Sequence, residues 1–205
     1  MTTEPRMLDL EPTARQLAGL LDAIGPDRLA DPTPCPDYRV RDLLQHVLGL
    51  TLAFRAAAQK DLGPLTDTAP DAPGAPRPAL DGDWRGRLRR QLDELVAAWR
   101  DPDAWQGDTR AGGVPLPAAV AGQVALNELL LHGWDLARAT GQPYAIDDAS
   151  ARASIALLSQ ETDDAAREGT GFGRVVPVPA DAPPLDQAVG LSGRDPSWTP
   201  PPATA

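Results

Sequence analysis

Two histidines and a glutamate are the residues of this chain that could together hold a metal ion. His46 and His132 are the only histidines in the sequence, and Glu128 precedes His132 by four residues. Residues four apart on an α-helix share one face, so the Glu128 carboxylate and the His132 imidazole can reach a common point. His46 lies in the middle of another helix-like apolar segment. If the two segments pack face to face, one cation would satisfy three polar groups in an otherwise apolar interior.

The residues around these three groups are small and apolar. The stripe that carries Glu128 and His132 also contains Ala121, Val124, Ala125, Leu136 and Ala139, and the stripe that carries His46 also contains Leu43, Gly49, Leu50, Ala53 and Ala57. Gly49 follows His46 by one turn and removes side-chain bulk there. Two other interpretations remain open, because a buried histidine can be a hydrogen-bonded core residue and a Glu and a His four residues apart can be an ordinary helix pair.

The elements that must position these residues are predicted to be helices. Hydrophobic residues make up 42% of the chain and aromatic residues only 4%, which favours a core of Leu, Val and Ala in helices over a sheet. Apolar residues recur at helical spacing in five segments, which are residues 7–25, 38–60, 83–101, 117–140 and 147–168. We therefore predict an all-α fold, a four-helix bundle with one extra helix.

The connections between these segments are rich in Pro and Gly. Residues 31–37 contain three prolines, and residues 61–82 have no periodicity and are predicted to be a long crossover. Residues 101–116 are predicted to be a loop, and residues 169–205 a tail that packs on the surface of the helical core at 7–168, with a short helical turn at 185–191. No repeat or second domain is evident, so residues 1–205 are predicted to form a single metal-binding helical domain.

Charge and cysteine content exclude several classes of function. The net charge is -10 and the isoelectric point is about 4.6, so the chain repels the phosphate backbone of nucleic acids. Cys35 is the only cysteine, which rules out an internal disulfide and fits a reducing compartment. The N-terminus is acidic and interrupted by Pro, unlike a signal peptide, and no apolar stretch is long enough for a membrane span. We expect a cytoplasmic protein.

Two motifs resemble those of a known family. TPCPDYRVRDLLQHVLG, residues 33–49, is similar to the second-helix signature of the DinB-like, mycothiol-dependent maleylpyruvate isomerase metal-binding domains, with Tyr38 where a tryptophan is usual. NELLLHGWDLARATGQP, residues 127–143, resembles the second signature of that family. The C-terminal VPVPADAPPLDQAVGLSGRDPSW looks like the ending of its actinobacterial members. The resemblance implies a four-helix bundle in which His46, Glu128 and His132 hold a divalent metal, usually Zn²⁺, with Ni²⁺, Fe²⁺ or Mn²⁺ as alternatives.

Three protein ligands would leave one coordination position open, as in catalytic rather than structural zinc sites. The resemblance implies that mycothiol or a related thiol binds there as thiolate and attacks a small electrophile, in an S-transferase or isomerase reaction. Two alternatives remain. One is a hydrolase that uses zinc hydroxide, and the other is a non-enzymatic binding or stress protein stabilised by the metal. The expected partners are a small-molecule thiol and an electrophilic substrate, in a monomer or homodimer. The sequence assigns no other catalytic or cofactor-binding residue.

Two further polar residues near the motifs could contribute. Asp135 follows His132 by three residues and could orient its imidazole from behind; it could equally bond a neighbouring side chain or loop. Cys35 could be a nucleophile near a helix N-terminus. A small packed residue in a proline-rich loop is the favoured interpretation of Cys35.

The arginines are predicted to lie in solvent. Arg55 and Arg138 could meet an anionic thiol or substrate, but solvated faces are the usual place of arginine. The Arg85–Arg90 cluster is predicted to be the solvent-exposed face of the third helix.

Overall fold

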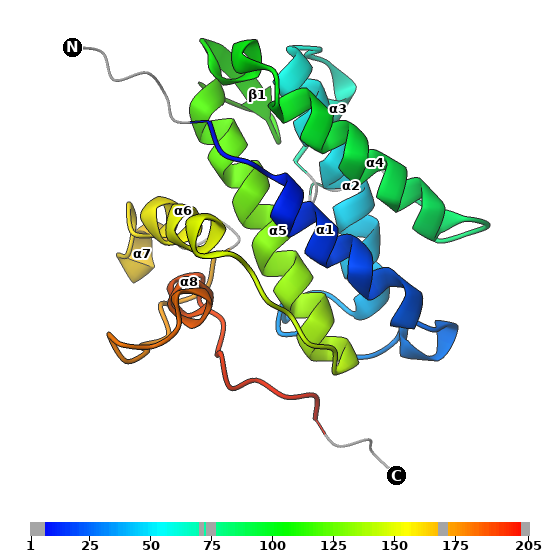
Figure 1. Cartoon of the computed structure of the whole chain (residues 1–205), viewed down its shortest axis with the longest axis vertical. Helices are drawn as coiled ribbons and strands as arrows, with labels where there is room; N and C mark the ends of the chain where they lie inside the picture. The colour runs from blue at the N-terminus through cyan, green and yellow to red at the C-terminus, as the bar shows by residue number, and fades with distance from the viewer. Residues whose placement is uncertain (1–6, 70–71, 73–76, 168–171, 202–205) are drawn as a thin grey trace.

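The structure is a computed structural model that describes residues 7–69, 72, 77–167 and 172–201. Residues 1–6 at the N-terminus, residues 70–71 and 73–76 of the expected crossover, residue 168 at the expected end of the fifth helix, and residues 169–171 and 202–205 of the tail lie outside the described residues. Four helices form the bundle: α1 (Glu11–Leu20), α2 (Val40–Gln59), α4 (Trp84–Trp99) and α5 (Ala118–Thr140). Helix α2 packs against α4 and α5, and α1 packs against the same two helices (Figure 1). The predicted four-helix bundle is confirmed.

The apolar stripes of the four helices form the core, as their spacing predicted. The apolar residues that recur at helical spacing in the first three predicted helices are buried, namely Leu10, Ala14, Leu17, Leu21, Ile24, Val40, Leu43, Leu44, Val47, Leu50, Phe54, Trp84, Leu88, Leu92, Leu95 and Trp99. Local hydrogen bonds fix the helix ends. The Asp42 carboxylate accepts from the Arg39 backbone N–H at 3.1 Å at the start of α2, and Gly141, with φ of +70°, ends α5 in the left-handed conformation. Helix α5 is the most buried element.

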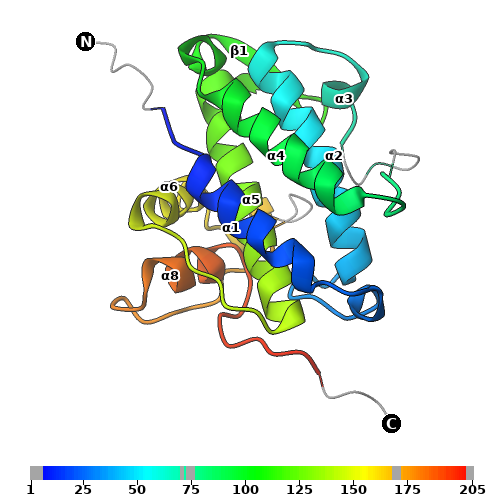
Figure 2. The same cartoon turned by 45° about the vertical axis from the view of Figure 1, so that its right-hand side comes forward.

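The long connection after α2 exists because α2 and α4 are neighbours that run in the same direction, as the chain colours show (Figures 1 and 2). A chain that leaves one end of α2 must return along the bundle before α4 can begin. The described part of the connection includes a short helix, α3 (Pro64–Asp67). The crossover predicted at residues 61–82 is thus confirmed in its topology for the described part.

The prediction of a simple loop at residues 101–116 is wrong. A 3₁₀ turn, η3 (Pro102–Trp105), is followed by an antiparallel hairpin of β1 (Asp108–Ala111) and β2 (Val114–Pro117). The two glycines between the strands both have positive φ, 58° at Gly112 and 81° at Gly113. Such a two-residue turn matches the twist of the flanking strands, so the Gly-Gly pair was a hairpin signal. The Thr109 hydroxyl donates to the Ala57 carbonyl at 2.7 Å and fastens the hairpin to the end of α2.

Two predicted helices are shorter than expected. Residues 7–10 are not helical, and a 3₁₀ turn, η1 (Leu21–Ala23), follows α1. The segment predicted as one helix over 147–168 contains α6 (Asp148–Leu158) and α7 (Asp164–Arg167). Asp147 caps α6 by accepting from the Ser150 N–H at 2.9 Å, and Asp163 accepts from the Ala165 N–H at 3.0 Å where α7 begins. The second of these aspartates marks a new helix start inside the segment.

The C-terminal segment is more deeply packed than a surface tail. The short helix predicted at 185–191 is confirmed as α8 (Pro184–Leu191), which packs against α6 on the side of α5 away from α2 and α4 (Figures 1 and 2). There Val189 joins Leu130, Leu131 and Trp134 of α5 in a second buried apolar cluster. Among the described residues, no helix has the length and low polarity required to cross a bilayer.

The face of α4 that carries Arg85–Arg90, which was predicted to be exposed to solvent, is only partly exposed. Arg85 is half-buried and donates from Nε to the Leu21 carbonyl at 3.0 Å and also to the Ile24 carbonyl, so it caps the end of the first helical segment. Arg89 pairs with Asp22 at 2.8 Å. These arginines therefore tie α4 to the chain after α1.

Candidate metal centre

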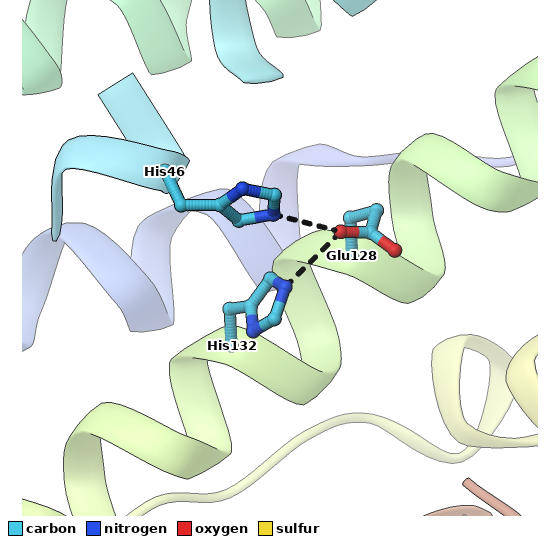
Figure 3. A group of neighbouring side chains, drawn as sticks. All are labelled: His46, Glu128 and His132. Carbon is cyan, nitrogen blue, oxygen red and sulfur yellow. Dashed lines mark ion pairs between the residues drawn. The ribbon is translucent and has the colours of Figure 1, made fainter. Parts of the chain in front are cut away.

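Helices α2 and α5 bring the three predicted ligands together. Glu128 Oε2 lies 3.1 Å from His132 Nε2 on its own helix and 3.5 Å from His46 Nε2 on α2. One nitrogen or oxygen from each residue lies within 4.8 Å of the other two. Figure 3 shows both imidazoles directed at the same carboxylate oxygen. The structure thus brings His46, Glu128 and His132 to one point between the two helices.

The donor set and its spacing fit a divalent cation. Ligand atoms about 2.0–2.1 Å from a tetrahedral Zn²⁺ lie about 3.3 Å from one another. The observed separations of 3.1 and 3.5 Å from Glu128 Oε2 to the two imidazole nitrogens bracket this value. Two imidazoles and one carboxylate are also a donor set used by catalytic zinc sites. The three residues therefore provide a suitable donor set for zinc, with all three ligand atoms within 4.8 Å of one another.

The charges in the cluster are strongly coupled. Burial alone would raise the pKa of Glu128, but hydrogen bonds from His132 and His46 outweigh it and hold that pKa well below its usual range. Burial alone would lower the pKa of His132, but its hydrogen bonds to Asp135 and Glu128 raise that pKa to about 9. Without a metal, the carboxylate therefore attracts a proton to His132, where a cation could take the proton's place.

The cluster is accessible from one side. The side chains of His46 and His132 are 9% and 8% exposed, whereas that of Glu128 is 22% exposed, so solvent reaches the carboxylate edge. A Cβ placed on Gly49, one turn from His46, would meet no atom within 4 Å, which confirms the space predicted there. In the described part of the chain, no fourth His, Cys, Asp or Glu joins the group.

Asp135 lies directly behind His132, which is the role suggested for it by its spacing. Its carboxylate Oδ2 is 3.1 Å from His132 Nδ1, on the side of the ring opposite Glu128. Asp135 is fully buried and forms a two-point ion pair with Arg194, whose Nε and Nη2 donate to the two carboxylate oxygens at 2.8 and 2.9 Å. Sequence reasoning missed Arg194, which lies in the loop after α8. The tail contains two arginines, Arg174 and Arg194, and the sequence has no signal that sets Arg194 apart.

His46 has a different neighbour. The Tyr38 hydroxyl lies 3.3 Å from His46 Nδ1, and the two rings are 5.2 Å apart. Tyr38 stands just before α2, at the position where the family signature usually has a tryptophan. The hydroxyl can donate to the imidazole or accept from it, depending on the tautomer.

The residues between the second histidine and Asp135 are also explained by packing. A Cβ on Gly133 would lie 2.3 Å from the Tyr144 hydroxyl, which donates to the Leu130 carbonyl at 3.1 Å. Trp134 packs in the apolar cluster beneath α8. The sequence His-Gly-Trp-Asp thus combines one proposed ligand, one close helix approach, one apolar anchor and one buried carboxylate.

The remaining candidates lie outside the cluster. Burial raises the pKa of the Cys35 thiol to about 11, and the nearby Asp135 carboxylate adds to this, so the structure does not activate Cys35 as a nucleophile. Arg55 pairs with Glu94 of α4. Arg138 donates to the Pro196 carbonyl and stacks near the Trp134 ring. These two arginines are engaged in tertiary contacts.

Comparison with known proteins adds relatives in sequence. A family model described as the mycothiol maleylpyruvate isomerase N-terminal domain matches residues 10–137. The uncharacterized protein Rv0738 of Mycobacterium tuberculosis is 30% identical over 86% of this chain and 91% of its own length. A second uncharacterized protein of that organism, Rv0036c, is 30% identical over 96% of this chain and 77% of its own length. The relatives are actinobacterial, as the C-terminal motif indicated.

Comparison with solved structures supports the fold. The crystal structure of the mycothiol-dependent maleylpyruvate isomerase matches with a TM-score of 0.54, and a histidine-to-alanine mutant of it matches with 0.56. Both are 18% identical to this chain. The match covers 73% of this chain and 66% of the isomerase, so about a third of the isomerase has no counterpart here.

Proposed function

Because this chain belongs to the mycothiol maleylpyruvate isomerase N-terminal domain family, we propose that it is a metal-dependent thiol S-transferase or isomerase. In this proposal His46, Glu128 and His132 hold one divalent cation, with zinc favoured, and mycothiol or a related small thiol is the co-substrate. The electrophile is a small molecule. The single metal-binding domain predicted over residues 1–205 belongs to the same proposal.

The observation that carries the proposal is the convergence of three donors with one side left open. A closed structural zinc site usually has four protein ligands. This cluster has three, and the exposed edge of Glu128 gives a ligand from solvent a way to approach. A bound divalent cation would supply Lewis acidity and favour the thiolate form of a thiol.

The residues of this chain contribute position and environment. Glu128 carries the negative charge of the cluster, and its low pKa keeps it ionised throughout the physiological pH range. Asp135 accepts from His132 Nδ1 and fixes the ring plane. The apolar positions Leu43, Val47, Ala125 and Leu129, which are buried on the two helices, exclude water from the inner side. Electrostatic interactions in such a site are stronger than in bulk water.

The alternative functions differ in the ligand that they would place in the open coordination position of the metal. A hydrolase would use the same open site with water, and no observation of this structure favours it over a thiol. The family relationship supports the thiol, because the solved isomerase is named as mycothiol-dependent. A purely structural metal is supported less well, since the described residues provide no fourth ligand.

A thiol-conjugation assay tests the proposal. We expect the zinc-loaded protein to accelerate conjugation of mycothiol to a chromogenic electrophile, and Glu128→Gln to abolish the acceleration. The matched control is Glu94→Gln, which removes an exposed carboxylate of α4 that pairs with Arg55 of α2 outside the cluster. A second arm measures maleylpyruvate isomerisation with mycothiol.

The outcomes separate the candidate functions. The proposal is supported if the protein accelerates the reaction with mycothiol in either arm, and if this acceleration is lost in Glu128→Gln but kept in Glu94→Gln. Thiol-independent hydrolysis of an ester, with no reaction of any thiol, would instead identify a hydrolase. A zinc-loaded protein inactive in every arm would contradict the enzymatic proposal.

A further inference from the structure

We propose that Arg194 is a positioning residue of the metal centre, which holds Asp135 so that His132 presents Nε2 to the cation. The inference rests on the metal site of the proposed function. It extends that site to a residue that lies 57 positions beyond the end of the region matched by the family model. It also gives the C-terminal segment a role at the centre rather than on the surface.

The contacts form an unbroken line from the tail to the cluster. Arg194 Nε and Nη2 donate to Asp135 Oδ1 and Oδ2 at 2.8 and 2.9 Å. Asp135 Oδ2 is 3.1 Å from His132 Nδ1, and His132 Nε2 is 3.1 Å from Glu128 Oε2. An arginine fork that meets a carboxylate at two points fixes the plane of the carboxylate as well as its distance.

The fixed carboxylate selects the useful form of His132. A carboxylate that is paired with arginine is ionised and only accepts hydrogen bonds. It therefore accepts a hydrogen bond from His132 Nδ1–H, and this tautomer of the neutral ring has its lone pair on Nε2, the atom that faces Glu128. Histidine ligands of metals are commonly held in this way by a carboxylate behind the ring.

Arg194 also balances the charge of Asp135. The Asp135 side chain is fully buried and that of Arg194 is 9% exposed, so water contributes little to either. Removal of the guanidinium would leave a buried carboxylate whose remaining close ionic partner among the described residues is His132. An uncompensated buried charge is strongly unfavourable, and the ring would be drawn toward Asp135 and away from Glu128.

The loop after α8 is built to aim this side chain. The Arg194 N–H donates to the Val189 carbonyl at 3.1 Å, and Arg194 Nη1 donates to the Ser192 hydroxyl at 3.2 Å. Gly193 has φ of +87°, and a Cβ there would lie 2.5 Å from the Gly173 backbone. Only glycine fits this position without strain. The backbone before Arg194 is therefore held on both sides.

Metal affinity, measured without any substrate, tests the proposal. We would titrate the metal-free protein with Zn²⁺ against a competing chelator and record the absorption bands of the Co²⁺ form. For Arg194→Met we expect a zinc Kd about 10–100-fold higher than that of the wild type and altered Co²⁺ bands, as is typical when the partner behind a histidine ligand is lost. The control is Arg138→Met, which removes another arginine that binds the tail, through the Pro196 carbonyl, without touching Asp135.

A purely structural role of Arg194 predicts a different pattern. It would lower the melting temperature of the metal-free protein but leave the zinc Kd of the folded protein and the Co²⁺ bands unchanged. If Arg194→Met does not fold, Arg194→Lys serves instead, because lysine keeps the charge but cannot form the two-point contact. We expect an intermediate rise in Kd for Arg194→Lys.

Every outcome is decisive. A folded Arg194→Met or Arg194→Lys that binds zinc as tightly as Arg138→Met and the wild type would overturn the role of Arg194 while leaving the proposed function intact. A wild-type protein that binds no zinc would overturn both. A rise in Kd confined to the Arg194 variants supports the positioning role.

Discussion

The two histidines of the cluster are supported in very different ways. His132, on α5, has a fully buried and ion-paired carboxylate at 3.1 Å from Nδ1. His46, on α2, has the neutral Tyr38 hydroxyl at 3.3 Å from Nδ1. Glu128 shares α5 with His132 and contacts its Nε2 more closely than that of His46. The α5 half of the centre is held by charge and burial, and the α2 half by a weaker polar contact.

This difference predicts which half of the centre sets the metal affinity and which half can adapt to different cations. A charge-assisted hydrogen bond in a buried setting is about twice as strong as a neutral one. We therefore expect the α5 half to set the strength of metal binding, while His46 can adjust its ring to different cations.

Removal of a proposed ligand should have the largest effect. We expect His132→Ala and Glu128→Ala to weaken zinc binding by more than about 100-fold, beyond the range typical of outer partners. His46→Ala should lose somewhat less, because Glu128 and His132 remain together on α5. Metal content after purification and zinc titration measure these effects, with Glu94→Ala as the control. Equal occupancy in the three ligand variants and the control would overturn the ligand assignment.

The pH dependence of zinc binding should be nearly as large. The pKa of His132 in the metal-free protein is raised to about 9, so at neutral pH zinc must displace its proton. The apparent association constant should rise about tenfold per pH unit below pH 9 and then level off. The same shift gives the metal-free protein a stabilising contribution that is complete below pH 6.5 and lost as the pH rises through about 9.

Calorimetric zinc titrations in two buffers of different ionisation enthalpy measure the released proton. We expect about one proton per zinc from His132 at pH 7. Asp135→Asn should shift the pH dependence to lower pH, since a neutral amide replaces the charged carboxylate that raises the His132 pKa. Zinc affinity that does not change between pH 6 and pH 8 would contradict the assigned role of His132.

Substitutions of Asp135 and Tyr38 compare the residues behind the two histidines directly. Asp135→Asn should weaken zinc binding by about 10–100-fold. Tyr38→Phe removes only a hydroxyl and should cost about threefold, near the value of one neutral hydrogen bond. Both are measured by zinc titration of the folded protein. If Tyr38→Phe costs as much as Asp135→Asn, the proposed asymmetry between the two halves is wrong.

Cys35 should have the smallest effect. Its thiol has a pKa raised to about 11 and lies outside the cluster, so Cys35→Ala should keep the zinc Kd and the thiol-transfer rate within about twofold of wild type. A large loss of transfer activity with unchanged metal binding would give Cys35 a chemical role that the structure does not indicate.

Much of the fold could be predicted from periodicity. The positions from Leu10 to Trp99 that recur at helical spacing are buried, because helices bury one face whatever their tertiary partners. The errors lie where one or two residues determine the local structure. Gly112 and Gly113 allowed a hairpin in a predicted loop, and Asp163 began a new helix inside a predicted one. Such signals involve one or two residues, and a window of helical length averages over them.

The metal site could be predicted only in part, because spacing along the sequence relates residues of one helix but not residues that are distant in the chain. Glu128 and His132 share one helix, so their spacing alone places them together. His46 was predicted from its place in the middle of a second apolar helical segment, and the family resemblance supported the same three residues. Asp135 could be inferred from its offset of three residues. Arg194 could not, because it lies 59 residues from its partner in a segment without periodicity. Only the folded structure brings that loop to the buried end of Asp135.

The most direct test of the central claim is a crystal structure of the protein as purified, with diffraction data collected on both sides of the zinc absorption edge. The account predicts one anomalous peak per chain, bound by His46 Nε2, a Glu128 carboxylate oxygen and His132 Nε2, with a non-protein ligand on the exposed side. Crystals soaked in zinc that show no peak between α2 and α5, with both imidazoles still directed at Glu128, would contradict it.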